Sequence, residues 1–295
     1  MYTRRFLDLF RISSAVRGMF SSSGTGKLSE LAKDGKPVLS LPESGDALYR
    51  LLCIAYPERS LETYSLAARN LDGIWAVHEA ANKYLFIAVQ ELLEKMLEAP
   101  ALVKTHSHRI FAIARLRGLR DLAEKAALCT LKSPVCPKGL AFPEMDLITA
   151  SSMQSLYEFH HQCGPETTIS STQAKSWRMS YSPSKWTDAP YVWWGTHSHG
   201  AGCGATESTH DYIHPTPWFA SHMKRLANSL RAIPAESTVE PGTINLVANE
   251  GLLVLACDMC SGRVDDELGD RARDLATEVK ESNLRLVKQP GVLGF

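Results

Sequence analysis

The stretch LDGIWAVHEAANKYLFIAVQELLEKMLEAP, Leu71 to Pro100, decides the fold class of this chain. Two apolar patterns with helical spacing follow one another in it. The first helix is expected to begin at the capping residue Asp72, and its apolar face is formed by Ile74, Val77, Ala81 and Tyr84. The second helix is expected to bury Ile87, Leu92, Met96 and Leu97. Pro100 ends it, so the segment predicts two consecutive amphipathic helices.

Helical patterns also flank this segment. Upstream, Ser44 can cap a helix that stops at Pro57, and the apolar stripe of that helix is Ala47, Leu48, Leu51, Leu52 and Ala55. Downstream, Gly118 separates two short helices of a predicted antiparallel hairpin. Three more helical regions are expected at residues 145–163, 217–234 and 245–287, the last of them with a break near Gly262. The first clear strand pattern is Lys36 to Ser44, so the chain is expected to be mainly α with an α+β remnant.

The order of these elements resembles a known family. The runs GKPVLSLPESGDALYRLLCIAYP, Gly35 to Pro57, and AVHEAANKYLFIAVQELLEKMLEAPAL, Ala76 to Leu102, closely resemble the second half of a BTB/POZ domain. The following HRIFAIARLRGLRDLAEKAALCTL resembles the helical extension found after that domain in many fungal BTB proteins. The resemblance covers about Phe6 to Leu131 and is specific in Val77 to Ala127. It is a match of ordered helices and stops, without a catalytic motif.

The resemblance implies a BTB/POZ fold that is incomplete at its N-terminus. Residues Phe10 to Phe20 resemble the family helix that follows two strands, and those strands have no counterpart here. A truncated product with an open sheet edge is therefore expected, and self-association through this region stays open because family dimers use it. The expected domains are a truncated BTB/POZ-like domain at residues 1–99, a helical extension at 100–163, a linker or long loop at 164–190, and a helical C-terminal region with a Trp/His/Cys cluster at 191–295.

Composition narrows the function. Lys plus Arg equals Asp plus Glu at 32 each, so no overall field attracts nucleic acid or an anionic membrane. No apolar run reaches the ~20 residues that span a bilayer. Seven scattered cysteines do not suggest a disulfide framework, and we expect a cytoplasmic or nuclear location. The resemblance implies a non-enzymatic adaptor that binds other proteins, either a cullin-type ubiquitin ligase scaffold or a chromatin complex.

A candidate metal site combines two distant segments. The run WWGTHSHGAGC carries His197, His199 and Cys203, and CDMC carries Cys257 and Cys260. We expect His197, His199, Cys257 and Cys260 to be the ligands of a structural zinc ion, with Cys203 as a substitute for His199. In related fungal BTB proteins, a Trp-containing segment with a cysteine pair precedes a Cys-x-x-Cys. Those related proteins usually have a cysteine at the position that corresponds to His197.

Three alternatives to structural zinc stay open. The two cysteines share a helical stripe with Leu253, Val264 and Leu268, which is typical of buried thiols in an apolar core. A thioredoxin-type redox pair would need a βαβ pattern, which this region lacks. The competing function is a metal-dependent enzyme, whose histidine cluster would be His197, His199, His210 and His214.

Other histidines have structural interpretations. The letters THSH also occur at Thr105 to His108, where Ser107 is expected to cap a helix and the histidines to lie in its first turn. His160 and His161 are expected near the C-terminal end of the 145–163 helix, where the helix dipole favours a partly positive imidazole. Neither pair is expected to bind a metal.

Overall fold

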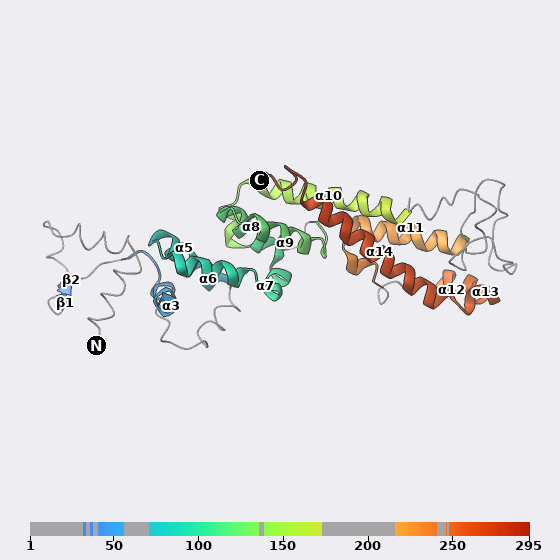
Figure 1. Ribbon diagram of the computed structural model, residues 1–295, viewed down its shortest axis with the longest axis horizontal. Helices are drawn as coiled ribbons and strands as arrows, with labels where there is room; N and C mark the ends of the chain where they lie inside the picture. The colour runs from blue at the N-terminus through green and yellow to red at the C-terminus, as the bar shows by residue number, and fades with distance from the viewer. Residues whose placement is uncertain are drawn as a thin grey trace. The chain divides into compact units, whose positions relative to one another are not determined.

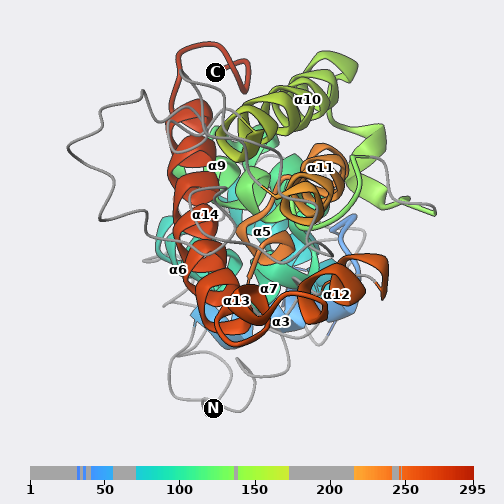
Figure 2. The ribbon, with the colours of Figure 1, turned by 90° about the vertical axis from the view of Figure 1, so that its right-hand side faces the viewer.

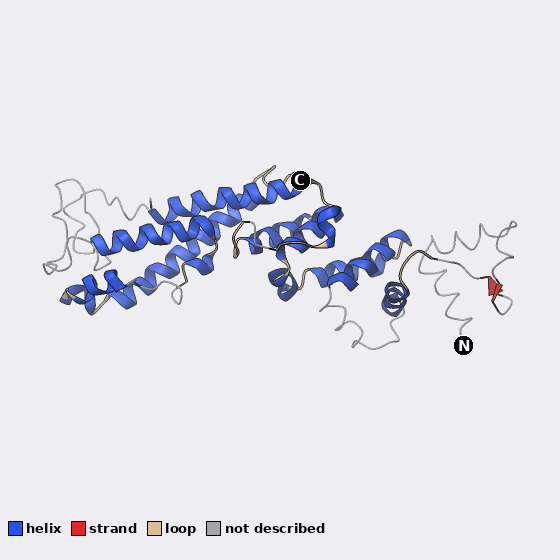
Figure 3. Cartoon of the chain, turned by 180° about the vertical axis from the view of Figure 1, so that it is seen from behind, coloured by secondary structure: helices blue, strands red, loops and turns tan. Residues whose placement is uncertain are grey.

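The computed structural model describes residues 32–33, 36–37, 41–55, 71–135, 139–172, 216–240, 246 and 248–295. The chain divides into two compact units, Met1–Thr105 and His106–Phe295, and each is described by itself. The described residues are mainly helical, which confirms the expected class (Figure 3). None of the described helices is both long enough and apolar enough to cross a lipid bilayer.

The described part of unit 1 contains a small hairpin and four helices. The strands β1 and β2 pair antiparallel with Lys33 opposite Lys36. The bounds are β1 Ala32–Lys33, β2 Lys36–Pro37, α3 Gly45–Ala55, α5 Leu71–Lys83, α6 Ile87–Leu97 and α7 Pro100–Thr105. The strand expected at Lys36 to Ser44 is thus wrong in its second half, because Leu41–Ser44 does not continue it. Ser44 instead caps α3, as predicted: its Oγ accepts the N–H of Ala47 at 3.2 Å.

The core of unit 1 lies between α3, α5 and α6. The predicted face of α5 is confirmed, since Ile74, Val77, Ala81 and Tyr84 are all buried. Asp72 lies inside the first turn rather than before it. The predicted face of α6 is wrong in part: Ile87 is exposed and Leu92 and Met96 are half-buried, whereas the buried side chains are Val89, Leu93 and Leu97. Spacing alone allowed either face, and packing selects the one around Leu93.

Unit 2 is an assembly of helices in which α10, α11 and α14 lie side by side (Figures 1 and 2). Its described elements are α8 Ser107–Arg117, α9 Arg120–Thr130, η2 Pro143–Asp146, α10 Ala150–Thr172, α11 Pro217–Ala232, η5 Glu236–Thr238, α12 Ala248–Leu255, α13 Asp258–Ser261 and α14 Val264–Val287. Pro217 stands in the first turn of α11 and Pro234 follows its end, as predicted. The predicted break near Gly262 is also present, between α13 and α14.

The hairpin of α8 and α9 turns at Gly118, as predicted. Gly118 has a φ of 70°, and the N–H of Leu119 bonds to the carbonyl of Ala114 at 2.9 Å, which is the pattern of a Schellman helix end. The expected cap at the other end of α8 is wrong. His106 occupies the cap position without a side-chain hydrogen bond, and Ser107 is the first helical residue and is buried.

Helix α10 extends beyond its expected end. The sequence predicts a linker that begins at Gly164, because the dipeptide Gly-Pro usually marks the end of a helix. The helix instead continues through Pro165 to Thr172. The hydroxyl of Thr167 donates to the carbonyls of Cys163 at 2.8 Å and Gly164 at 3.1 Å. Packing of α10 on α11 and α14 stabilises this extension, so the first nine residues of the expected linker 164–190 are helical.

Gly164 lets α10 approach α11 closely. A Cβ atom built on Gly164 would lie 2.9 Å from the carbonyl oxygen of Arg231 and 3.4 Å from its Cα. Both neighbours are backbone atoms, so neither can move aside by a rotamer change. The distance between the two helices at this point is therefore set by the absence of a side chain at residue 164.

We expect Gly164→Ala to lower the free energy of unfolding by about 1–3 kcal/mol, because overpacking forces the two backbones apart. The matched control is Gly251→Ala in α12, where nothing lies within 4 Å of the added methyl group. That substitution should leave stability unchanged or raise it by up to about 1 kcal/mol. Urea denaturation of both variants measures the difference, and equal stabilities would contradict the close-approach argument.

Candidate functional site

The two cysteines of the predicted metal site lie at the junction between α12 and α14. Cys257 has an extended backbone and caps α13, and its carbonyl accepts the N–H groups of Cys260 at 3.0 Å and Ser261 at 2.9 Å. This single turn brings the two residues of the Cys-x-x-Cys together. Both side chains are buried, with exposed fractions of 1% and 0%.

The surroundings of these thiols are apolar. Cys257 and Cys260 belong to a cluster of buried side chains from α11, α12, α13 and α14. Its other members are Trp218, Phe219, Met223, Leu226, Leu230, Val239, Val254, Val264, Leu268, Leu275 and Val279, with Leu253 packed against it. The stripe expected from the sequence is thus part of the core. This supports the interpretation of the two cysteines as small apolar side chains.

The other predicted ligands lie outside the described residues. This holds for His197, His199 and Cys203, and equally for His210 and His214 of the proposed enzyme centre. Within the part of the chain that is described, no group of three or more His, Cys, Asp and Glu side chains is arranged to hold a metal ion. Of the four predicted zinc ligands, the two that the structure describes are Cys257 and Cys260, and one helical turn brings them together.

A partly buried polar cluster that the sequence did not indicate connects α11 to α12. Arg225 Nη2 lies 2.8 Å from Glu250 Oε2 and 3.0 Å from His222 Nδ1. The same carboxylate oxygen lies 3.4 Å from His222 Nδ1. His222 and Glu250 are almost fully buried. The i, i+3 spacing of His222 and Arg225 was visible in the sequence, but nothing in it indicated Glu250 as the third member.

The protonation state of His222 follows from this geometry. Burial lowers the pKa of the imidazole, Glu250 raises it and Arg225 lowers it, and the net shift is downward. A neutral imidazole can accept the Arg225 hydrogen bond at Nδ1, which is also the shorter of the two contacts of that atom. The cluster therefore consists of a neutral histidine and an arginine–glutamate ion pair.

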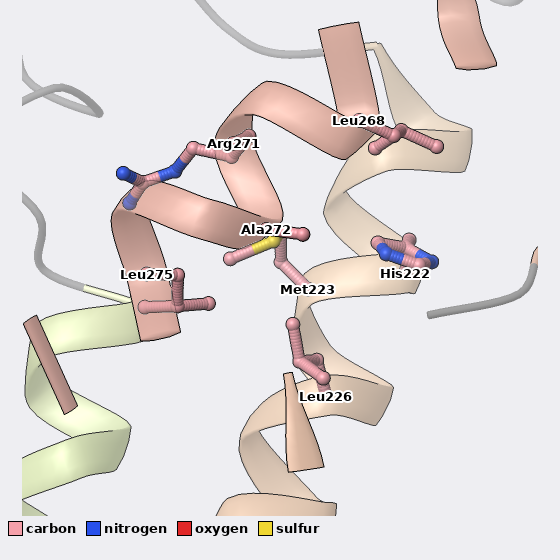
Figure 4. Close-up of a pocket in the computed structure, with 7 residues that line it drawn as sticks. All are labelled: His222, Met223, Leu226, Leu268, Arg271, Ala272 and Leu275. Carbon is pink, nitrogen blue, oxygen red and sulfur yellow. The ribbon is translucent and has the colours of Figure 1, made fainter. Parts of the chain in front are cut away.

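A small hollow beside His222 is mainly apolar. It is lined by His222, Met223, Leu226, Leu268, Arg271, Ala272 and Leu275 (Figure 4). The imidazole of His222 and the guanidinium of Arg271 lie on opposite sides of Met223 in this view. Arg271 Nη1 instead donates to Glu278 Oε1 at 3.2 Å. Because the polar groups do not converge, we assign the hollow to helix packing rather than to a ligand.

A pair of buried histidines, His108 and His160, lies between α8 and α10. His160 Nε2 donates to the carbonyl of Ser133 at 3.0 Å. Burial lowers the pKa of both His108 and His160, and the charge of His160 lowers the pKa of His108 further. The expected role of His160 at a helix C-terminus is wrong, because α10 continues for twelve more residues to Thr172. His160 is an interior hydrogen-bond donor instead.

Two more buried groups are structural. Arg109 Nε and Nη2 donate to the two carboxylate oxygens of Glu144 at 2.7 and 2.8 Å, and Glu144 is fully buried. This bidentate pair attaches η2 to α8.

Burial raises the pKa of the Cys163 thiol to about 12, with a smaller contribution from Glu166. The thiol of Cys163 is thus protonated at neutral pH and unsuited to nucleophilic attack.

These features define a mainly α-helical protein in which His160, Glu144 and Glu250 bond to other protein groups within the helix packing. The chain matches no protein-family model, no curated protein and no solved structure.

The buried histidines predict acid sensitivity. A histidine whose folded pKa lies below its unfolded value of about 6.5 binds protons preferentially in the unfolded state. The free energy of unfolding should therefore fall as the pH drops below about 6.5, until the folded pKa is passed. His160→Gln retains a donor for Ser133 and should reduce the loss of stability between about pH 7.5 and 5.5. Urea denaturation at these pH values measures it.

The control for this prediction is Gln162→Ala, an exposed position on α10 that carries no titratable group. It should leave the pH dependence of stability as in the wild type. Equal slopes for His160→Gln and the wild type would show that the buried imidazole does not couple protonation to unfolding.

The cysteine pair gives a test of packing against zinc. As a core side chain, Cys260 replaced by Ala should lower the free energy of unfolding by about 1–2 kcal/mol. Cys260→Ser should cost more, since it buries a hydroxyl group. Zinc content per chain, measured by mass spectrometry of the metal, should be equal in the wild type and both variants. Cys129→Ser, at a half-buried position in α9, is the control. Loss of one zinc equivalent on changing Cys257 or Cys260 would instead assign a structural ion to the pair, with His197 and His199 as its further ligands.

Proposed function

We propose that this chain is a non-enzymatic interaction protein of BTB type, and that unit 1 is its partner-binding module. The observation that carries the proposal is the α5–α6 segment. The Ala-Ala-x-x-Tyr pattern that resembles the BTB family falls on Ala80, Ala81 and Tyr84, and all three are buried. The helix ends at Lys83 and the next one begins at Ile87, which agrees with the order of helices and stops in that resemblance.

The junction between α5 and α6 carries an unusual residue. Leu85 has a φ of 56°, and no other non-glycine residue among the described ones has a positive φ. The N–H of Phe86 bonds to the carbonyl of Ala81 at 2.8 Å and the N–H of Leu85 to that of Asn82 at 3.2 Å, which is a Schellman end. Glycine is usual at this position, and a leucine there costs roughly 1–2 kcal/mol.

The side chain of Leu85, whose backbone is strained, is also exposed. Leu85 is 47% exposed and its neighbour Ile87 is 55% exposed, so two large apolar side chains flank the junction. Neither contributes to the core that Phe86, directly between them, helps to form. Strained backbone and exposed apolar side chains together are typical of a contact surface for another protein. We call Leu85 and Ile87 the junction surface.

The class of partner follows from the resemblance. A BTB-type adaptor holds a protein target and a scaffold at once, and the scaffold is either a cullin-type ubiquitin ligase or a chromatin complex. The equal numbers of acidic and basic residues favour neither nucleic acid nor a membrane as the direct ligand. The corresponding location is the cytoplasm, the nucleus or both.

Leu85→Gly tests whether the positive φ of Leu85 lowers the stability of the chain. Glycine adopts the left-handed conformation without strain, so the variant should gain about 0.5–1 kcal/mol in the free energy of unfolding. The matched control is Gly118→Ala at the equivalent end of α8, where nothing crowds the new methyl group and only the positive φ opposes it. That variant should lose about 1 kcal/mol. Thermal and urea denaturation measure both.

The same substitution, combined with Ile87→Ser, tests the proposed function. Tagged wild-type and variant chains are recovered from the native host and their partners are quantified by mass spectrometry. The wild type should retain subunits of a cullin ligase or of a chromatin complex, and the variant should retain at least about ten-fold less. Leu147→Ser, at an exposed apolar position in unit 2, serves as the control. Absence of both classes of partner, or equal recovery by the variant, would overturn the proposal.

A further inference from the structure

The last seven residues form an ordered segment, which we call the C-terminal strap (residues 289–295). Two turns follow the end of α14, closed by hydrogen bonds from Val292 N to Gln289 O at 3.3 Å and from Gly294 N to Gly291 O at 3.1 Å. Leu293 is buried at 3% exposure, although the segment has no helix or strand. The marked C-terminus lies beside α10 in Figures 1 and 2.

The strap rests on side chains from α8, α9 and α10, which we call the strap seat: Arg115, Arg120, Ser152 and Ser155. Arg115 Nη2 donates to the carbonyl of Gly294 at 3.0 Å and to Ser152 Oγ at 3.2 Å. The Arg115 guanidinium lies 4.1 Å from the centre of the Phe295 ring, and that of Arg120 lies 5.9 Å from it. The aromatic ring therefore lies within cation–π range of both guanidinium groups.

The fit at Gly294 is selective. Its φ is 68°, and a Cβ atom there would lie 2.9 Å from Ser155 Oγ. Backbone conformation and available space both favour glycine at this position. The seat thus distinguishes three consecutive positions: a buried aliphatic side chain at 293, a glycine at 294 and an aromatic ring at 295.

Recognition of this kind does not require the rest of α14. The residues that join the strap to the helix, Lys288 to Gly291, are exposed, and Gly291 has a φ of 81° with nothing within 4 Å of its Cα substituent position. The contacts with the seat come from Gly294, through its carbonyl, and from the ring of Phe295, and Leu293 is buried next to them in the sequence. A separate peptide with the same three residues presents the same groups.

We propose that the strap seat is a peptide-recognition site for an aliphatic-Gly-aromatic segment of a partner protein, and that the chain's own strap occupies it in cis. Arg115 binds both the backbone and the ring of the segment, and the positive φ of the middle position, with Ser155 Oγ close by, favours glycine there. Because the strap is tethered beside its seat, it competes with a segment in trans at a high effective concentration. This site lies within unit 2 and is independent of the function proposed for unit 1.

The test uses the full chain and a fluorescein-labelled octapeptide with the sequence KQPGVLGF, followed by fluorescence anisotropy. Gly294→Ala should unseat the strap, and this variant should bind the peptide at least ten-fold more tightly than the wild type does. Leu293→Asp unseats the strap by a different route, through a buried charge, and should give the same gain. Circular dichroism verifies that both variants retain the helical fold.

Two matched controls establish specificity. The peptide KQPGVLAF, with alanine at the middle position, should bind the Gly294→Ala chain at least ten-fold more weakly than KQPGVLGF. Adding Arg115→Ala should also weaken binding at least ten-fold, whereas adding Arg273→Ala, at an exposed position on α14, should not.

Two results would overturn the proposal. One is a folded Gly294→Ala or Leu293→Asp chain that binds the peptide no better than the wild type. The other is a concentration-dependent dimer of the wild type that Gly294→Ala abolishes, since that would assign the seat to strap exchange between two copies.

Discussion

The close approach of α10 to α11 at Gly164 is the constraint on which unit 2 depends. Backbone meets backbone there, so the two helices pack nearer than side chains would allow. That contact holds α10 helical across Pro165, where the loss of an N–H and the ring of the proline oppose it. The continuation in turn buries Thr167, whose hydroxyl bonds back to the carbonyls of the same turn. The absence of a side chain at residue 164 thus determines how far α10 extends along α11.

Close helix packing also explains why buried polar side chains of unit 2 bond to groups from other segments of the chain. When helices approach closely, polar side chains at their contact surfaces lose water and need partners within the protein. His160 finds the carbonyl of Ser133, Asn283 Nδ2 donates to the carbonyl of Pro234 at 2.6 Å, and Glu144 accepts both hydrogen bonds of Arg109. Each joins segments far apart in the sequence, so these bonds fix how the helices sit against one another.

Local patterns allowed most helices to be predicted, and long-range contacts account for the errors. The cap at Ser44, the turn at Gly118 and the start of α11 at Pro217 depend on neighbours within four residues, and all three are present. The end of α10 and the buried face of α6 depend on what packs against them, which periodicity does not specify. For the candidate site, the sequence indicated that Cys257 and Cys260 share an apolar stripe. The His222–Arg225–Glu250 cluster was missed because Glu250 lies 25 residues beyond Arg225.

The two helix ends at Leu85 and Gly118 show how a local rule can point to function. Both have the same hydrogen-bond pattern and the same left-handed residue, but one carries the side chain that this conformation disfavours. Leu85 is not among the buried core residues described in unit 1, and 47% of its side chain is exposed. Stability alone would favour glycine at both positions. A leucine that costs stability at a helix end, with about half of its side chain exposed beside the exposed Ile87, favours a role in contact with another protein, and this is why the junction surface, rather than the buried clusters of unit 2, is the better candidate for partner binding.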